Sequence, residues 1–343
     1  MKALVLEEYN RLVYRDWPDP EIADNEVLVR IRAAAICGSD VHGMDGSTGR
    51  RIPPVIMGHE ASGIIEETGS EVRNMKKGDR VTFDSTIYSP ADWYSLKGLY
   101  NLSDNRMVLG VSTEEYRRHG AFAEYLNVPE HILYRLPDDV SYTQAAMVEP
   151  LAVAAHAAGL ASPSWNDSVA VIGSGMIGLS LIQVLRSMGC GKIFAVDTDP
   201  FKLGLALRLG ADQAFDPREA PVSDSITELT AGRGADLVFE AVGTGETLST
   251  AVASVRKGGT VVLVGNLSPE AIIPLQNVVT RQIRLQGSCA ICGEFPAVLD
   301  MMARGEINTD PLISAEAPLS EGAEWFRRLY AREPGLLKVV LHP

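Results

Sequence analysis

A glycine-rich turn between a buried strand and a helix is the feature that most constrains the fold. Residues 168–173 read SVAVIG, an apolar run without alternation, as expected of a parallel strand that is buried on both faces. The pattern G-x-G-x-x-G follows at 173–178, and a helical pattern extends over 176–188. This order is the fingerprint of a dinucleotide-binding βαβ unit. It predicts a Rossmann domain, which is a doubly wound parallel sheet.

Strand candidates recur after helical stretches in the second half of the chain. They lie at residues 192–197, 213–216, 235–242, 260–265 and 284–287. Strands that alternate with helices predict a parallel sheet. Before Leu151 the chain instead holds short strand-like runs broken by glycine and proline, which is typical of a barrel or sandwich. We therefore expect an α/β protein with a β-rich domain and a Rossmann domain.

The 343 residues are enough for two domains. We place the β-rich domain at 1–152, the nucleotide-binding domain at 153–289 and a return to the first domain at 290–343. A helical pattern over 138–158, with Ser141 as its N-cap, would lead from one to the other. The run LKVVL at 337–341 predicts one more strand, which could join the sheet of the first domain.

The glycine-rich turn has a separate physical role for each glycine. Gly173 permits the tight turn, Gly175 lets the backbone approach a pyrophosphate, and Gly178 lets the helix pack against the strand. The first helical residues, Met176 and Ile177, lie where amide groups and the helix dipole bind phosphates. The plainer alternative is a cluster of turn glycines without a ligand.

Asp197 ends the second strand of the predicted Rossmann domain. It follows the glycines by about 20 residues, where a carboxylate binds the ribose hydroxyls. A 2′-phosphate would be repelled there, so we expect NAD rather than NADP. A solvated aspartate without a ligand is the alternative.

Charge and composition exclude several kinds of partner. The formal net charge is −13 and no block of lysine or arginine is present, which argues against nucleic acid or an anionic membrane as the main partner. No apolar run reaches the roughly 20 residues that span a bilayer. Residues 1–15 mix charged and apolar side chains, so we expect no secretory leader. The four cysteines do not resemble a disulfide framework, and we expect a cytoplasmic location.

The motifs CGSDVH at 37–42 and GHE at 58–60 carry most of the chemistry of the first domain. Cys37, His59 and Glu60 are all of zinc-ligand types. Each alone has a plainer explanation: a small buried thiol, a core histidine and a surface charge.

Together these motifs resemble the zinc-containing medium-chain dehydrogenase/reductase family, whose members carry them in this order before the nucleotide-binding domain. The resemblance continues in GDRV at 78–81, GAFAEY at 120–125, the Glu-Pro pair at 149–150 and the terminal strand. It implies a GroES-like catalytic domain beside the Rossmann domain. Glu149 stands where many alcohol dehydrogenases of the family have cysteine, which resembles the sorbitol, polyol-phosphate and threonine dehydrogenase branches.

The resemblance implies one catalytic zinc ion per subunit. Cys37, His59 and Glu149 are the zinc-sphere residues it points to, and Glu60 is an alternative or exchanging ligand. The sequence does not rank Glu60 against Glu149. Three protein ligands would leave one position open for water or substrate, as catalytic zinc requires.

The same resemblance implies a reaction, in which zinc polarises a secondary hydroxyl and hydride passes from its carbon to NAD, giving a ketone. Ser39 can accept the proton and His42 can pass it to solvent, and with the exchanging Glu60 they are the expected catalytic groups. The plainer alternatives are a turn serine and a surface histidine. We expect the substrate to be a small polar alcohol, a polyol or sugar derivative.

The chain departs from many relatives where they hold a second, structural zinc with cysteines spaced C-x2-C-x2-C-x7-C. The corresponding positions are Ser89, Asp92, Ser95 and Ser103. Because structural zinc sites use cysteine and histidine, we predict that this zinc is absent. The lobe would be held by apolar packing of Tyr88, Trp93, Tyr94, Leu96, Leu99 and Tyr100.

Two further features leave alternatives open. Cys289 and Cys292 form C-x-x-C without a partner pair, so we interpret them as unligated thiols near the domain junction, with a redox role as the alternative. Arg50 and Arg51 could border the active site and bind a phosphate or carboxylate, or lie in a solvated loop.

Several functions other than polyol oxidation are compatible with the sequence. Within the family these are a threonine-type dehydrogenase and a sugar-phosphate dehydrogenase. A catalytically silent NAD-binding protein would be expected to have lost its metal ligands, and a zinc-independent quinone reductase would not need them. Relatives associate through the nucleotide-binding domain, so we expect a homodimer or homotetramer.

Overall fold

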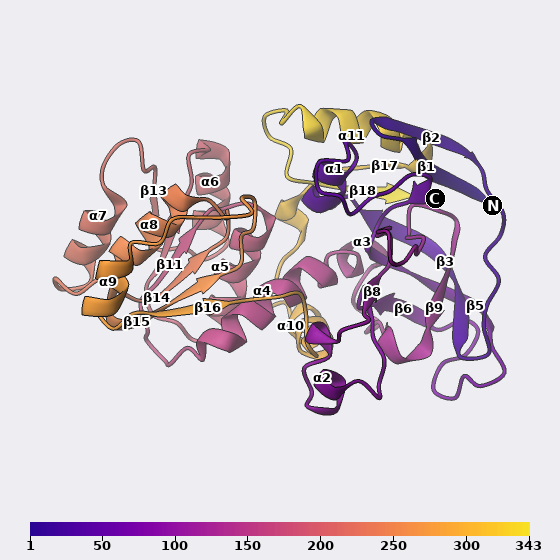
Figure 1. The fold of residues 1–343 in the computed structure, drawn as a ribbon, viewed down its shortest axis with the longest axis horizontal. Helices are drawn as coiled ribbons and strands as arrows, with labels where there is room; N and C mark the ends of the chain where they lie inside the picture. Colours follow the sequence, from indigo (N-terminus) through magenta and orange to yellow (C-terminus); the bar gives the residue numbers. More distant parts are fainter. The chain divides into compact units, whose positions relative to one another are not determined.

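The computed structural model describes residues 1–343, which form two compact units (Figure 1). The first unit comprises Met1–Glu149, Ile291–Ala303 and Thr309–Pro343, and the second comprises Pro150–Ala290 and Arg304–Asn308. The short segment Arg304–Asn308 lies within 290–343, which we expected to return to the first domain. It belongs to the second unit, where Ser187 Oγ donates to Glu306 (2.6 Å) and the Asn308 amide donates to Gln183 (2.8 Å).

The first unit is built on a mixed sheet of seven strands, in the order β10-β6-β5-β3-β18-β17, with β9 paired to β3. The strands of this sheet are β3 (Glu26–Ala35), β5 (Glu60–Thr68), β6 (Arg80–Phe83), β9 (Tyr125–Pro129), β10 (Leu133–Arg135), β17 (Ile313–Pro318) and β18 (Lys338–His342). The strand predicted from LKVVL does join this sheet, antiparallel to β3 with Val340 opposite Ala35.

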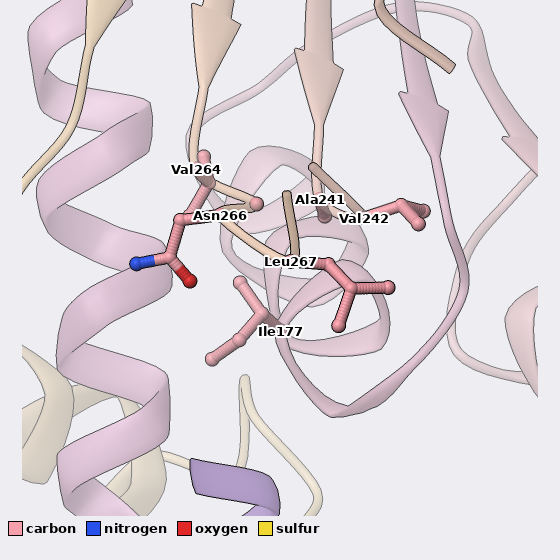
Figure 2. Close-up of a pocket in the computed structure, with 7 residues that line it drawn as sticks. Ile177, Ala241, Val242, Val264, Asn266 and Leu267 are labelled. Carbon is pink, nitrogen blue, oxygen red and sulfur yellow. The ribbon is translucent and has the colours of Figure 1, made fainter. Parts of the chain in front are cut away.

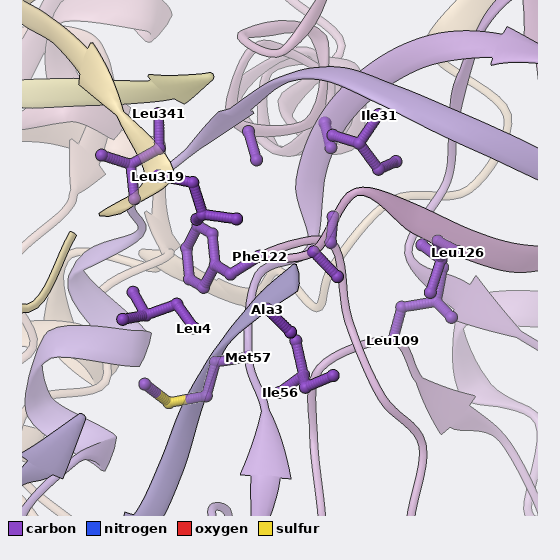
Figure 3. Close-up of a cluster of buried hydrophobic side chains, with 14 of the residues drawn as sticks. Ala3, Leu4, Ile31, Ile56, Met57, Leu109, Phe122, Leu126, Leu319 and Leu341 are labelled. Carbon is purple, nitrogen blue, oxygen red and sulfur yellow. The ribbon is translucent and has the colours of Figure 1, made fainter. Parts of the chain in front are cut away.

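Two smaller sheets complete the β-structure of this unit. They are made of β1 (Lys2–Glu8), β2 (Arg11–Asp16) and β4 (Val55–Ile56), and of β7 (Thr86–Ile87) and β8 (Met107–Val108). Apolar side chains at alternate positions of β3, such as Val27, Val29 and Ile31, are buried, as a strand with one face in the core requires. They belong to a single core that also contains Phe122 and Leu341 (Figure 3).

Short helices connect these strands. They are α1 (Gly38–Gly43), α2 (Trp93–Leu96), η1 (Tyr100–Leu102), η2 (Glu130–Ile132), α3 (Tyr142–Ala145), α10 (Phe295–Ala303), η3 (Asp310–Leu312), η4 (Leu319–Glu321) and α11 (Gly322–Tyr330). Ser141 caps α3 in a capping box with Gln144. The helix expected over 138–158 is two helices, because α3 ends before α4 (Val148–Ala161) begins. Pro150 explains the break, since proline has no amide donor and clashes with the carbonyl four residues earlier.

The second unit contains a sheet of six parallel strands in the order β13-β12-β11-β14-β15-β16. The strands are β11 (Val169–Ile172), β12 (Ile193–Val196), β13 (Gln213–Phe215), β14 (Ala235–Glu240), β15 (Val255–Leu263) and β16 (Arg284–Gly287). The helices are α5 (Met176–Ser187), α6 (Pro200–Arg208), α7 (Val222–Leu229), α8 (Gly245–Ser254) and α9 (Leu275–Thr280). The predicted doubly wound sheet is thus confirmed, and its order reverses between β11 and β14, where such sheets bind ligands.

The helices are all too short or too polar to span a lipid bilayer. None of the four cysteines forms a disulfide, and Cys292 Sγ lies 3.0 Å from the carbonyl oxygen of Gly98, to which it donates. The cytoplasmic location and the redox alternative for the C-x-x-C pair stay predictions.

Candidate metal and coenzyme sites

Three side chains of zinc-ligand types meet at one end of the main sheet of the first unit. The ligand atoms of Cys37, His59 and Glu60 all lie within 4.8 Å of one another. The register of β3 and β5 explains this, because Ala35 is paired with Glu60. Cys37 follows Ala35 by two residues and His59 directly precedes Glu60, so the two motifs of the sequence come together here.

A buried aspartate and arginine lie behind His59. Asp40 Oδ2 is 3.4 Å from His59 Nδ1, and Arg51 Nη2 is 2.7 Å from Asp40 Oδ1. Burial raises the pKa of Asp40, but the charges of His59 and Arg51 outweigh burial and hold that pKa well below its usual value. Burial lowers the pKa of His59, but the charges of Asp40 and Cys37 outweigh it and hold that pKa well above its usual value. Negatively charged groups therefore face the imidazole.

The donor set fits a zinc ion. Sulfur, nitrogen and oxygen at bond lengths of about 2.0–2.3 Å are its usual ligands, and His59 Nε2 faces the cysteine side, 3.5 Å from Ser39 Oγ. His59 Nδ1 and Asp40 Oδ2 are buried and have no well-formed hydrogen bond. Metal-binding histidines commonly direct the other ring nitrogen to a carboxylate in this way. Cys37, His59 and Glu60 could thus hold a divalent ion, with Asp40 orienting the imidazole.

Glu60 has a partner that the sequence analysis missed. Lys338 Nζ of β18 lies 2.5 Å from Glu60 Oε2, and both side chains are buried. Burial lowers the pKa of Lys338, but the charge of Glu60 outweighs it, so the pKa is raised. Glu60 Oε1 remains for a metal ion. The only signal in the sequence is a lysine within the apolar strand LKVVL.

Glu149 lies in the first turn of α4 and accepts a hydrogen bond of 3.4 Å from Ser85 Oγ. Burial, and the charges of Glu60 and Asp84, raise its pKa to about 7, although the charge of His59 lowers it. Its carboxylate is not part of the group of three atoms within 4.8 Å. The geometry therefore groups Glu60 rather than Glu149 with Cys37 and His59.

The two residues expected to move a proton lie on α1. Ser39 Oγ is 3.3 Å from Cys37 Sγ and 3.5 Å from His59 Nε2, so it lies at the metal-ligand group. His42 is exposed, and three residues along a helix place it on the same side as Ser39. Its carbonyl oxygen accepts a hydrogen bond from Ser47 Oγ.

In the glycine-rich turn of the second unit, only one of the three glycines has open space beside it for a ligand. Gly173 has φ +94°, and a Cβ there would lie 2.5 Å from Val242 Cγ2. A Cβ at Gly178 would lie 1.9 Å from the Gly173 carbonyl oxygen, whereas one at Gly175 would meet nothing within 4 Å. The space beside Gly175, at the first turn of α5 with Met176 and Ile177, is where a pyrophosphate would approach the backbone.

Asp197 follows β12 beside this turn. Its Oδ2 accepts a hydrogen bond from the Ser174 amide (2.8 Å) and its Oδ1 accepts one from the Asp199 amide (2.9 Å). Each carboxylate oxygen has further acceptor capacity, so ribose hydroxyls could still bind.

A pocket lies beyond the carboxyl ends of β14 and β15 (Figure 2). It is lined by Ile177, Ala241, Val242, Val264, Gly265, Asn266 and Leu267. Of these, sequence reasoning singled out only Ile177. The pocket lies at the edge of the sheet where a doubly wound fold binds its coenzyme.

Comparison with known proteins decides the family. The model of the alcohol dehydrogenase GroES-like domain matches residues 23–138, and that of the zinc-binding dehydrogenases matches 177–304. A D-arabitol-phosphate dehydrogenase from Enterococcus avium is 32% identical over 338 residues, which cover 97% of this chain and 94% of that protein. The chain belongs to the zinc-binding alcohol dehydrogenase family.

Two further comparisons agree over the full length of this dehydrogenase. A sorbitol dehydrogenase from Bacillus subtilis is 30% identical over 348 residues, covering 100% of this chain and 97% of that protein. The structure of a zinc-binding dehydrogenase from Sinorhizobium meliloti, bound to NADP, matches with a TM-score of 0.91 and 30% identity, covering 100% of this chain and 99% of that one. The GroES-like and Rossmann folds are thereby confirmed.

The lobe that would carry a structural zinc is held differently from our expectation. Trp93, Leu96 and Leu99 were expected to pack, but they are 63%, 72% and 43% exposed. The helix α2 has only four residues, so it cannot bury an apolar face of its own. Of the residues expected to pack, Tyr88 and Tyr100 do so, with ring centroids 4.3 Å apart, and the Gly98 carbonyl oxygen accepts a hydrogen bond from Cys292 Sγ.

Three of the four positions that correspond to structural zinc ligands can be described by their hydrogen bonds. Asp92 caps α2 by accepting hydrogen bonds from the amides of Tyr94 and Ser95. The hydroxyls of Ser95 and Ser103 are buried without a hydrogen bond. The absence of a structural zinc from this dehydrogenase stays a prediction.

The paired arginines do not form a phosphate site together. The Arg51 guanidinium donates to Asp40 and to the Arg50 carbonyl oxygen, and the side chain is buried. Arg51 therefore orients Asp40 and is not available to a substrate. Only Arg50 of this pair is exposed.

Proposed function

We propose that this dehydrogenase oxidises a secondary hydroxyl of a polyol or sugar derivative to a ketone, with NAD as hydride acceptor and a zinc ion on Cys37, His59 and Glu60. The observation that carries the proposal is the group of three ligand atoms within 4.8 Å. The relatives that act on sorbitol and arabitol phosphate support a polyol as substrate.

The residues around the metal ligands have different roles in the reaction. Zinc, when bound, supplies the Lewis acidity that lowers the pKa of a substrate hydroxyl. Ser39 Oγ, within 3.5 Å of the ligand atoms of Cys37 and His59, accepts the hydroxyl proton, and His42 passes it to solvent. Glu149, half-buried and close enough to Glu60 to be affected by its charge, would help to orient a bound substrate. Lys338 keeps Glu60 Oε2 engaged, so that Oε1 is directed to the metal.

The first experiment is NADH formation across polyols, polyol phosphates, threonine and simple alcohols, with and without chelation. We expect a polyol or its phosphate to be oxidised, chelation to abolish the activity and zinc to restore it. Turnover that survives verified loss of zinc would exclude the metal mechanism. A protein that binds zinc and NAD but oxidises nothing on the panel would favour the catalytically silent alternative, and threonine turnover would reassign the substrate.

A phosphorylated polyol is the second candidate substrate. Arg50 is exposed, and burial raises the pKa of nearby Tyr116 although the charges of Arg106, Arg51 and Arg50 lower it. Arg51 is committed to Asp40, so Arg50 is the cation of this loop that a phosphate could reach. A KM at least tenfold lower for a polyol phosphate than for the free polyol would favour this candidate.

The proposal of NAD rests on Asp197. The related structure from Sinorhizobium meliloti holds NADP, so that comparison does not favour NAD. Asp197→Asn keeps an oxygen that can accept the Ser174 amide, but it removes the charge that repels a 2′-phosphate. We expect the ratio of kcat/KM for NAD over NADP to fall about tenfold, which is about 1.4 kcal/mol. Steady-state kinetics with both coenzymes measure it. Asp199→Asn is the control, because Asp199 caps α6 and should leave the ratio unchanged.

We further propose that the chain forms a homodimer, or a homotetramer built from such dimers, through the β16 edge of the second unit. β16 is the last strand of its sheet, and four exposed apolar side chains follow β15 or lie in α9: Leu267, Ile272, Leu275 and Val279. Open strand edges and apolar patches favour association. Light scattering should give a multiple of the 37.0 kDa chain mass, and Leu275→Glu should reduce it. A monomeric wild-type chain would contradict the proposal.

A further inference from the structure

Two neighbouring residues connect the lobe 89–103 to the metal-ligand group. Asp84 and Ser85 link β6 to β7 and are 1% and 4% exposed. Asp84 Oδ2 accepts a hydrogen bond of 2.8 Å from the Tyr100 hydroxyl in the lobe. Ser85 Oγ donates to Glu149 Oε1 at 3.4 Å. One side chain thus faces the lobe and the next faces the half-buried Glu149 carboxylate, on which the charges of His59 and Glu60 act.

The main chain between these side chains is fixed. The Asp84 amide donates to the Ile132 carbonyl oxygen (2.9 Å), and the Ser85 carbonyl oxygen accepts the Leu109 amide (3.0 Å). Asp84 Oδ1 also accepts the Thr86 amide at 2.9 Å. The Asp84 carboxylate is thus one of the groups that hold the segment that carries Ser85.

Tyr100 is itself held by aromatic neighbours on the first unit. It stacks on Tyr88, which meets His131 edge-on with ring centroids 4.9 Å apart. Burial and the charge of Asp84 raise the pKa of Tyr134 to about 12, which places that phenol in the same group, and its ring stacks on Phe295. Since Trp93, Leu96 and Leu99 are exposed, the half-buried Tyr100 is one of the contacts that hold the lobe.

We propose that Tyr100 and Asp84 are positioning residues, which anchor the lobe and, through Ser85, hold Glu149 in place beside the metal ligands. The order of the lobe then sets the affinity of the metal site. This inference rests on the proposed function, because it assumes that zinc binds at Cys37, His59 and Glu60.

The test compares Tyr100→Phe, Ser85→Ala and the double variant in the full-length chain. Tyr100→Phe keeps the stacked ring and removes the hydroxyl that donates to Asp84. Zinc affinity is measured by competition with a chelator, and lobe order by the rate of tryptic cleavage at exposed Lys97. Tyr94→Phe is the matched control, because it removes a hydroxyl of the same lobe that lies outside the anchor.

We expect Ser85→Ala and Tyr100→Phe each to weaken zinc binding about tenfold, because each loosens Glu149, a carboxylate outside the three ligands, and changes to such neighbouring groups commonly cost tenfold or more in metal affinity. Only Tyr100→Phe should speed cleavage at Lys97. The double variant should bind zinc as Ser85→Ala does, because the two residues act in series. Tyr94→Phe should match the wild type in both measurements.

Four results would overturn the inference. They are unchanged zinc affinity in Tyr100→Phe, a hundredfold loss in the double variant, weakened zinc binding in Tyr94→Phe, and a wild-type chain that binds no zinc. The zinc measurement needs no substrate. A chain that shows the expected pattern but oxidises no polyol would therefore retain the inference and contradict the proposed function. A chain that oxidises a polyol but lacks the expected pattern would retain the proposed function and contradict the inference.

Discussion

Replacing His59 by alanine should abolish zinc binding and reduce kcat/KM for the polyol substrate by about 1,000-fold. His59 supplies one of three ligand atoms within 4.8 Å, and its loss leaves two protein ligands where catalytic zinc needs three. A metal's Lewis acidity is worth several kcal/mol of transition-state stabilisation, and each 1.36 kcal/mol is a factor of ten. Metal content by elemental analysis and steady-state kinetics measure both effects.

His342→Ala is the control for this prediction. His342 is on β18 of the same unit, where its ring contacts Glu316 and the Arg32 carbonyl oxygen, away from the metal ligands. It should retain one zinc ion and nearly full activity. Stoichiometric zinc and ordinary turnover in His59→Ala would show that the metal lies elsewhere.

Lys338→Met should destabilise the metal-free chain by about 3–5 kcal/mol, because it leaves the buried Glu60 carboxylate without its counter-charge. Lys338 and Glu60 are 2.5 Å apart and only 3% and 1% exposed, so water does not replace the lost partner. Zinc should restore part of the stability, since the metal supplies positive charge at the same carboxylate. Urea unfolding of the metal-free and zinc-loaded chains measures both differences.

Lys338→Arg keeps the charge and tests whether charge or packing is responsible. It should lose less stability than Lys338→Met, although the larger guanidinium has to fit the same site. Equal stability of Lys338→Met and wild type in the metal-free state would mean that Glu60 is protonated or solvated there. The role given to Lys338 would then be wrong.

The sequence predicts the fold well because its signals are local. An unbroken apolar run and the glycine-rich turn specify β11 and α5, and the alternation of apolar residues in β3 specifies one buried face. The break before α4 was missed, because a helical pattern over 138–158 outweighed the effect of Pro150. In the lobe, composition shows that Trp93 and Leu96 are apolar but does not show which side of a four-residue helix meets the core.

The candidate site likewise has residues that local sequence motifs predict and residues that they do not. Cys37 and His59 are recognisable because they stand in short motifs. Arg51 was misinterpreted, because its contact with Asp40 depends on how the loop after α1 folds back. Lys338 could not be assigned, since its partner is 278 residues away in sequence and only the insertion of β18 beside β3 brings the two together.

The place of β18 has a consequence for how the protein is made. Ribosomes add about 5–20 residues per second, so Glu60 is synthesised tens of seconds before the lysine that neutralises it. During that interval every strand of the coenzyme-binding sheet is synthesised, and this sheet can fold while the first unit still lacks β18. The metal-binding end of the first unit is then completed last, when β18 pairs with β3. A nascent chain stalled before residue 338 would hold Cys37, His59 and Glu60 without the charge that neutralises Glu60.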